Sequence, residues 1–217
     1  MEEKISRIDF GFVNAYLLQT ADSFVLVDTG VGKDWQKFES ELLRRGALPE
    51  HLKLVILTHG DLDHSGNCKH LQEKYGLKIA VHEGDYELVT KGDFGKRSAS
   101  SLLGRFINLL GNKTNSPADL FEPDLFLTDG QRLDEFGLPA VVIHTPGHTI
   151  GSISILTDDG GLLVGDTLGN FVKPVTGGLF VSKTDLQNSL SKLRNCKAET
   201  IYPGHGKPFA FREFPED

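Results

Sequence analysis

Seven histidine and aspartate residues lie in four short segments of the chain, THGDLDHSG, TPGHTIGS, LVGDTLG and YPGHGKP. These residues are His59, Asp61, Asp63, His64, His148, Asp166 and His205. Imidazole nitrogens favour zinc or iron, and carboxylate oxygens add harder ligands. A lone histidine or aspartate after a strand is usually a structural or turn residue. Because a histidine or aspartate next to glycine recurs at the end of a predicted strand in all four segments, we predict a metal centre.

The first segment carries four of these residues within six positions, which is enough for two metal ions. In an extended chain, His59, Asp61 and Asp63 would point to one side and His64 to the other. Asp166 could bridge two metals, because one carboxylate has two oxygens. Two neighbouring metals would lower the pKa of a shared water, which is the chemistry of a hydrolase. A centre with one metal stays open as an alternative.

Strand-like apolar runs lead into these segments and should position them. LKLVILTHG leads to the first, PAVVIHTPGHT to the second and LLVGDT to the third, while ETIYPGHG contains the fourth. Helical spacing of apolar residues is present in residues 33–45, in CKHLQEKYG and from Leu186 to Leu193. Strands and helices interleave without a linker. We therefore predict one α/β domain over residues 1–217, with helices outside two packed sheets and a helical insert at about 84–113.

Charge and composition exclude several classes of protein. The formal net charge is −7, whereas a groove for nucleic acid needs a basic excess. Two cysteines, Cys68 and Cys196, are too few for a disulfide scaffold. The acidic start does not resemble a secretory signal, and no apolar run approaches the roughly 20 residues that span a bilayer. We expect a cytoplasmic protein that acts on a small molecule, with neither nucleic acid nor membrane as a partner.

The four segments, in this order, resemble the successive metal motifs of the metallo-β-lactamase-fold hydrolase superfamily. Upstream, VNAYLL and FVLVDTG resemble the opening hairpin of that family and its strand-end aspartate, here Asp28. The resemblance covers roughly residues 5–210. It implies an αββα sandwich of two mixed sheets with two divalent metal ions, zinc in the first instance and iron or manganese as alternatives. By motif position, it implies that one ion is held by His59, Asp61 and His148 and the other by Asp63, His64 and His205, with Asp166 shared.

Position 61 departs from the family pattern His-x-His-x-Asp-His, because this chain has Asp61 where the second histidine stands. Flavodiiron proteins, a redox branch of the family, resemble the chain more closely here, since they carry a carboxylate. They add a flavodoxin-like domain, for which 217 residues leave no room. An iron-dependent oxidoreductase related to that branch is therefore kept as an alternative function.

The leading hypothesis is a metal-dependent hydrolase, in which a metal-bound hydroxide attacks an ester, a thioester or a lactone. Asp63 would orient the hydroxide as well as ligate a metal. A phosphodiesterase or nuclease of the same fold is a further alternative, which the net charge disfavours. A β-lactamase in the strict sense is disfavoured because such enzymes are exported and the chain carries no export signal. No substrate-binding residue is assigned.

A basic stretch favours a small anionic substrate. Residues 91–113 carry a net charge of +4 in a chain of net charge −7. The basic residues are Lys91, Lys96, Arg97, Arg105 and Lys113. Within the stretch, Leu102, Leu103, Phe106, Ile107 and Leu110 fall at helical spacing. We interpret it either as a solvated helix on the core, or as a lid over the metal site or the interface of a homodimer.

Overall fold

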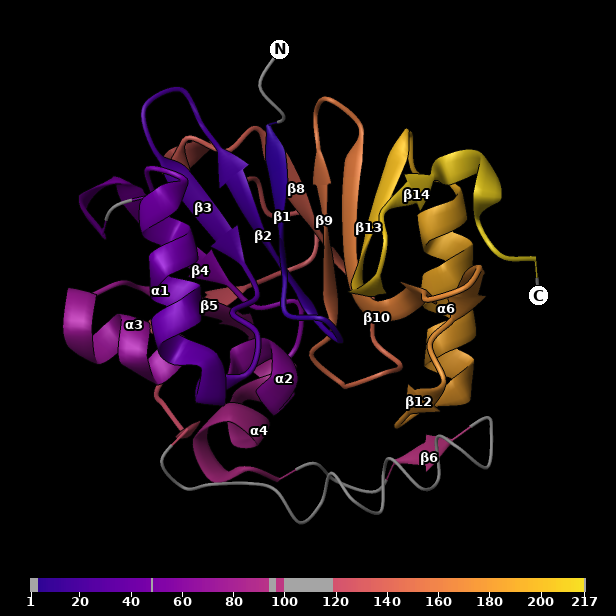
Figure 1. The fold of residues 1–217 in the computed structure, drawn as a ribbon. Coiled ribbons are helices and arrows are strands. Elements are labelled where there is room, and N and C mark those ends of the chain that lie inside the picture. Colours follow the sequence, from indigo (N-terminus) through magenta and orange to yellow (C-terminus); the bar gives the residue numbers. More distant parts are fainter. Residues whose placement is uncertain (1–3, 48, 94–96, 100–118, 217) are drawn as a thin grey trace.

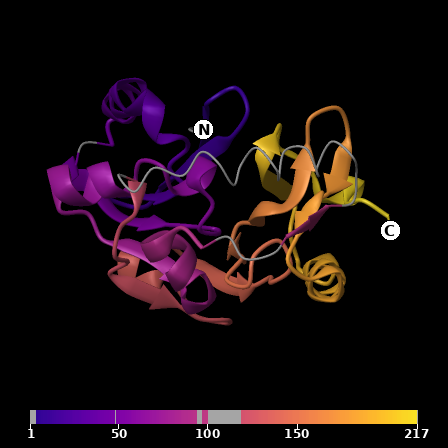
Figure 2. The same ribbon diagram turned by 90° about the horizontal axis from the view of Figure 1, so that it is seen from below.

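Two β-sheets packed face to face form the centre of the computed structural model of this chain (Figure 1). The structure describes residues 4–47, 49–93, 97–99 and 119–216. Each of the two sheets has six strands, and helices lie on their outer faces (Figures 1 and 2). This is the αββα sandwich that the resemblance implied, and the α/β fold class is confirmed.

The first sheet has the strand order β1-β2-β3-β4-β5-β7. Its strands are β1 (Ile5–Asp9), β2 (Asn14–Gln19), β3 (Phe24–Val27), β4 (Leu52–Ile56), β5 (Ile79–His82) and β7 (Leu125–Leu127). The first three strands pair antiparallel, and the remaining pairs are parallel. Parallel neighbours need crossover connections. Helices α1 (Trp35–Arg44) and α3 (Cys68–Tyr75) lie in two of these connections.

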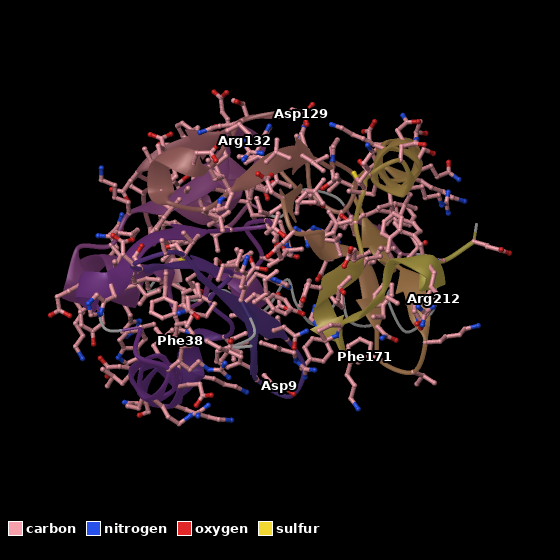
Figure 3. The ribbon with its side chains drawn as sticks, turned by 90° about the horizontal axis from the view of Figure 1, so that it is seen from above. Asp9, Phe38, Asp129, Arg132, Phe171 and Arg212 are labelled. Atoms are coloured by element: carbon pink, nitrogen blue, oxygen red, sulfur yellow. The ribbon has the colours of Figure 1, made fainter. Side chains whose placement is uncertain are left out.

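Both faces of the first sheet are buried. In β3, Val25 and Val27 face the second sheet, while Leu26 faces the layer of α1 and α3. Phe38 of α1 is fully buried in that outer layer, where Figure 3 shows it between the helix and the sheet. Alternate residues therefore serve two different cores, which is why the strands of this half have nearly continuous apolar runs.

The second sheet has the order β14-β13-β10-β9-β8, and β11 pairs with β10. Its strands are β8 (Ala140–His144), β9 (Ile153–Thr157), β10 (Gly161–Asn170), β11 (Pro174–Thr176), β13 (Thr200–Gly206) and β14 (Phe209–Ala210). Strand β10 is parallel to β13, and the other pairs are antiparallel. Helix α6 (Lys183–Arg194) packs on the outer face through Leu186, Leu190 and Leu193.

Short elements complete the chain. They are the one-turn helix α2 (Leu62–Ser65) and the 3-10 helices η1 (Gly32–Asp34), η2 (Pro49–His51), η3 (Glu83–Asp85), η5 (Asp134–Phe136) and η6 (Phe211–Glu213). In the described part of the chain, no helix has the length and apolar character needed to cross a membrane.

The predicted helical insert at 84–113 is described only in part. Helix α4 (Tyr86–Lys91) lies at its start. Further on, Ser98–Ala99 is a two-residue strand, β6, which pairs with β12 (Leu179–Phe180). Residues 94–96 and 100–118 lie outside the described residues. The apolar stripe predicted from Leu102 to Leu110, and the basic residues Lys96, Arg105 and Lys113, fall there.

Candidate metal centre

The seven predicted site residues come together at one end of the sandwich, the lower end in Figure 1, where α2 is labelled. Their side chains form three groups whose potential ligand atoms lie within 4.8 Å of one another. The groups are His59, Asp61 and His148; Asp63, His64 and His205; and His59, His64 and Asp166. In every group, two residues come from positions 59–64 and one comes from the second half of the chain. The first two groups are the ligand sets that the resemblance implied.

Asp63 lies on a different side from the one that strand alternation predicted. It groups with His64 and His205, not with His59 and Asp61. The cause is local, because the chain stops being extended at Asp61 and begins helix α2 at Leu62. In a helix, successive side chains are about 100° apart and not on opposite faces, so Asp63 and His64 both reach the second group.

Asp166 lies between the first two groups. Its Oδ2 is 3.7 Å from His148 Nε2 and 3.2 Å from His205 Nε2, and its Oδ1 is 3.2 Å from His64 Nε2. One carboxylate therefore faces histidines of both groups, as a bridging ligand must. Close backbone approach makes room for it: a Cβ at Gly204 would lie 2.6 Å from Asp166 Oδ1. Any larger residue at position 204 would displace this carboxylate.

All four histidines turn Nε2 towards the centre, because each Nδ1 has a partner outside it. His64 Nδ1 lies 2.9 Å from Asp28 Oδ2, and His148 Nδ1 lies 2.9 Å from the Leu179 carbonyl oxygen. The remaining partners are Thr58 Oγ1 for His59, at 3.1 Å, and the Phe12 carbonyl oxygen for His205, at 2.7 Å. Such Nδ1–H donation fixes the tautomer with a free Nε2 lone pair, as in metal-bound histidines.

Three buried atoms of this set have no hydrogen-bond partner among the described residues. They are His59 Nε2, His64 Nε2 and Asp166 Oδ1. His64 Nε2 and Asp166 Oδ1 approach to 3.2 Å but are not aligned for a hydrogen bond. Leaving buried polar atoms unpaired is costly, so such groups call for an explanation. A divalent cation would satisfy all three, and the residues present therefore fit a metal.

The charges of the metal-free centre also favour a cation. Burial alone would lower the pKa of His64, but the carboxylates of Asp166, Asp28 and Asp63 raise it well above its usual range. Burial would likewise raise the pKa of Asp166, but His205 and His64 hold it well below its usual range. The carboxylates therefore favour positive charge at this point of the centre, which a bound cation would supply.

Asp61 has a partner that its position in the motif did not predict. Arg97 Nη1 and Nη2 each lie 2.5 Å from one oxygen of its carboxylate. Asp61 Oδ2 also lies 3.0 Å from His148 Nε2 and 3.5 Å from His59 Nε2. Burial would raise the pKa of Asp61, but the Arg97 guanidinium, with His148 and His59, holds it well below its usual range.

Asp85 is a positioning residue that the sequence did not indicate. Its buried carboxylate accepts hydrogen bonds from Gly60 N, Gly151 N and Thr149 Oγ1, each at 2.8 Å. It therefore ties the segment of His59 to the segment of His148. An aspartate in EGD after a strand has the sequence signal of an ordinary turn or cap residue.

Two exposed phenylalanines flank His205 at the edge of the centre. Phe12 and Phe171 are 54% and 60% exposed, and their rings stack at 5.7 Å. Phe12 lies 4.5 Å and Phe171 5.8 Å from the His205 ring, between centroids. Figure 3 labels Phe171 on the edge of the molecule opposite Arg132. These aromatic faces offer an apolar surface beside the candidate ligands.

Cys68, His82 and His144 are not in the described ligand groups. Cys68 is fully buried, and burial raises the pKa of its thiol, which disfavours a nucleophilic role. His82 and His144 stack on each other with their ring planes 9° apart.

Comparisons with known proteins identify the family of this chain. The family model of the metallo-beta-lactamase superfamily matches residues 8–205. A probable metallo-hydrolase of Bacillus subtilis, YflN, is 29% identical over 94% of this chain and 84% of its own length. A hydroxyacylglutathione hydrolase of Pelagibacter ubique is 27% identical over 71% of this chain and 52% of its own length. Among solved structures, the metallo-beta-lactamase family protein TTHA1429 of Thermus thermophilus superposes with a TM-score of 0.70 and 25% identity, over 95% of this chain and 74% of that one.

The chain therefore belongs to the metallo-beta-lactamase superfamily. Its relatives include two proteins named probable metallo-hydrolases, and the fold implies a divalent metal for which the described residues provide ligand groups.

Proposed function

We propose that this protein is a metal-dependent hydrolase with a dinuclear centre at the ends of the two sheets. The observation that carries the proposal is the convergence of four oriented Nε2 atoms on Asp166, with three buried ligand atoms left unpaired. One ion would be held by His59, Asp61 and His148. The other would be held by Asp63, His64 and His205, with Asp166 shared. Zinc is the metal we propose first, because imidazoles form most of the ligand set.

Bound divalent cations would polarise a substrate oxygen and make water nucleophilic near neutral pH. The protein's own residues then have separate roles. Asp63 has the most exposed carboxylate of the set, at 32%, against 17% for Asp166 and 11% for Asp61. It therefore faces the side from which water and substrate arrive. We assign it the orientation of the attacking water and the acceptance of its proton.

The substrate that we propose is a small anionic ester, thioester or lactone. Residues 91–113 keep a net charge of +2 in the sequence when Lys91, which pairs with Glu87, and Arg97, which pairs with Asp61, are left out, and this charge supports the anionic part. The Phe12–Phe171 surface supports an apolar group next to the reacting bond. The relative named hydroxyacylglutathione hydrolase is consistent with an acyl substrate. A cytoplasmic location and a small-molecule partner remain part of this proposal, and a homodimer formed through the insert remains an option.

The carboxylate of Asp61 in the first metal group favours a second candidate function. A carboxylate makes the first group harder than three imidazoles would, and harder ligands suit iron or manganese. An iron-dependent oxidoreductase is therefore the second candidate. A phosphodiesterase would need the same two ions and differs only in its substrate.

One sample can test these candidates together. Protein purified without chelator is analysed for zinc, iron and manganese, and the same sample is assayed on aryl esters, acyl thioesters, lactones and an aryl phosphodiester. We expect zinc with ester, thioester or lactone hydrolysis, abolished by Asp63→Asn and retained by Asp134→Asn, an exposed control. Iron content with no hydrolysis would favour the oxidoreductase. Zinc-loaded protein that hydrolyses none of the acyl substrates would contradict the proposed hydrolase.

A further inference from the structure

Arg97 and Asp61 form a buried ion pair at the edge of the first metal group, which consists of His59, Asp61 and His148. The Arg97 side chain is 6% exposed and that of Asp61 is 11% exposed. The guanidinium meets both carboxylate oxygens at 2.5 Å, the bidentate geometry that gives strong charge-assisted hydrogen bonds. Arg97 directly precedes β6, whose partner β12 contains Leu179, and the Leu179 carbonyl oxygen accepts from His148. The arginine thus lies next to two residues of that group.

The other two carboxylates of the centre lack such a partner among the described residues. Within 4 Å, Asp63 pairs with His64 and His205. Asp166 pairs with His64, His148 and His205. Among the described residues, the second metal group, formed by Asp63, His64 and His205, therefore has no arginine or lysine within 4 Å that competes with a metal for its carboxylate. The first group has its one carboxylate already neutralised by arginine.

The pair also explains how the chain accommodates aspartate at position 61. A neutral imidazole contributes no charge to a metal group, and Asp61 together with Arg97 contributes none either. Asp61 alone would place an uncompensated charge in a buried site, which is strongly unfavourable in the absence of a metal. The arginine is therefore the substitute for a cation in the metal-free first group.

We propose that Arg97 sets the order and strength of metal loading, by competing with the metal for the Asp61 carboxylate. The first group is then the weaker site and the second group the tighter one. A cation at the first group must either displace the arginine fork or share oxygens whose charge the fork already neutralises. Removing the guanidinium would leave Asp61 free for the metal alone. This inference rests on the metal centre of the proposed function, and not on the reaction that the centre performs.

The test is a zinc titration of chelator-stripped protein in competition with a chromophoric chelator, which reads affinity and stoichiometry without an assay of activity. For the wild type we expect a tight zinc and a weaker one. Arg97→Gln should tighten the weaker zinc by about 10-fold to 100-fold, the size of a lost charge-assisted interaction. The tight zinc should be unchanged. Arg97→Lys keeps the charge but loses the fork, and should tighten the weaker zinc by a smaller factor.

Matched variants assign the tight and the weaker zinc-binding step to the two metal groups. His148→Gln should remove the weaker zinc, and His205→Gln should remove the tighter one. Adding Arg97→Gln to His205→Gln should then tighten the single remaining step. Lys91→Gln is the control, because it removes a positive charge from an exposed residue of α4 that pairs with Glu87. It should leave both steps as in the wild type.

The inference is overturned if neither Arg97 variant changes the weaker step, or if Arg97→Gln weakens it. Loss of the tighter step in His148→Gln would also overturn it, because the order of loading would be reversed. If zinc loads in the expected order but no acyl substrate is hydrolysed, the proposed reaction fails and this inference stands. If acyl substrates are hydrolysed but the zinc-binding steps are the same in the wild type and the Arg97 variants, this inference fails and the proposed function stands.

Discussion

Asp28 Oδ2 lies 2.9 Å from Nδ1 of His64, and both side chains are buried in the interior behind the candidate metal centre. The same carboxylate accepts hydrogen bonds from the backbone N–H and the hydroxyl group of Thr58, each at 2.8 Å. Among the described residues, Asp28 is the one non-glycine with a positive φ, at 60°. Aspartate and asparagine tolerate this conformation better than other side chains. The chain thus holds Asp28 in an uncommon backbone geometry that aims it at His64.

Asp28→Asn should weaken zinc binding with little change in fold. The substitution keeps the shape and the tolerance of positive φ, but it removes the charge that orients His64 and raises its basicity. We expect zinc at the second metal group to bind about 10-fold to 100-fold more weakly, as is usual when such outer partners are lost. Chelator competition measures the affinity, and the exposed variant Asp134→Asn is the control. Equal zinc affinities in Asp28→Asn and Asp134→Asn would contradict the orienting role of Asp28.

Asp85→Asn should destabilise the protein without removing any candidate ligand. The carboxylate accepts three hydrogen bonds with its two oxygens, and an amide would turn one donor towards another donor. We expect the free energy of unfolding to fall by about 1–3 kcal/mol, the cost of a buried unsatisfied polar group. Urea denaturation of metal-free protein measures this change. Glu83→Gln, an exposed neighbour in η3, should have no comparable effect, and equal losses in both would contradict the assigned role.

Asp166→Asn should have the largest effect of any single ligand substitution. It keeps the shape of the side chain but removes the charge that faces His148, His64 and His205 together. We expect metal content to fall towards one ion or none per chain, and hydrolysis to be lost. Elemental analysis of the purified variant gives the metal content. Retention of two ions would exclude Asp166 as the bridge.

His82 should make stability dependent on pH near neutrality. Burial, and then the neighbouring His144, lower the pKa of His82 from 6.5, against the opposing charges of Asp85, Glu83 and Asp129. Its Nδ1 accepts from Gly84 N at 3.0 Å, and protonation would break that bond. Because the folded pKa is lowered, this stability is fully present above about pH 6.5 and is lost as the pH falls through the folded pKa.

His82→Asn provides the comparison for this pH dependence. An asparagine oxygen can accept from Gly84 N, as in helix caps, and it does not titrate. Urea denaturation of metal-free protein across this pH range should show the wild type losing stability relative to the variant. The histidines of the metal centre are common to both proteins, so their contribution cancels in the difference. Parallel profiles would show that His82 does not contribute.

Local patterns predicted most of the fold and all seven candidate ligands. Helix α1 was readable from the spacing of Trp35, Phe38 and Leu42, and glycine-flanked histidines marked the strand ends. The side on which Asp63 lies was not predicted, because strand alternation carries no information about a helix that begins at Leu62, the residue before Asp63. An extended chain over residues 59–64 places Asp63 with His59 and Asp61, whereas the helix that begins at Leu62 places it with His64.

Long-range pairs account for the rest of what the sequence did not predict. Arg97 is 36 positions from Asp61, and Asp85 is 64 positions from Thr149. The basic insert indicated an anionic ligand, but it gave no means of telling that one arginine would pair with a predicted metal ligand. Such pairings depend on how loops that are distant in the sequence pack together, and neither hydrophobic periodicity nor motif spacing predicts this packing.

Each described ligand group combines two residues of positions 59–64 with one residue from the second half of the chain. A bound ion therefore connects segments that only the docking of the two sheets brings together. A folding intermediate with the first sheet alone would present incomplete groups, so the ion gains its affinity late, after that docking. Interactions formed after the folding transition state slow unfolding and leave the folding rate nearly unchanged. Metal loading should thus lengthen the lifetime of the native state, and chelation should shorten it, with the speed of folding little affected in either case.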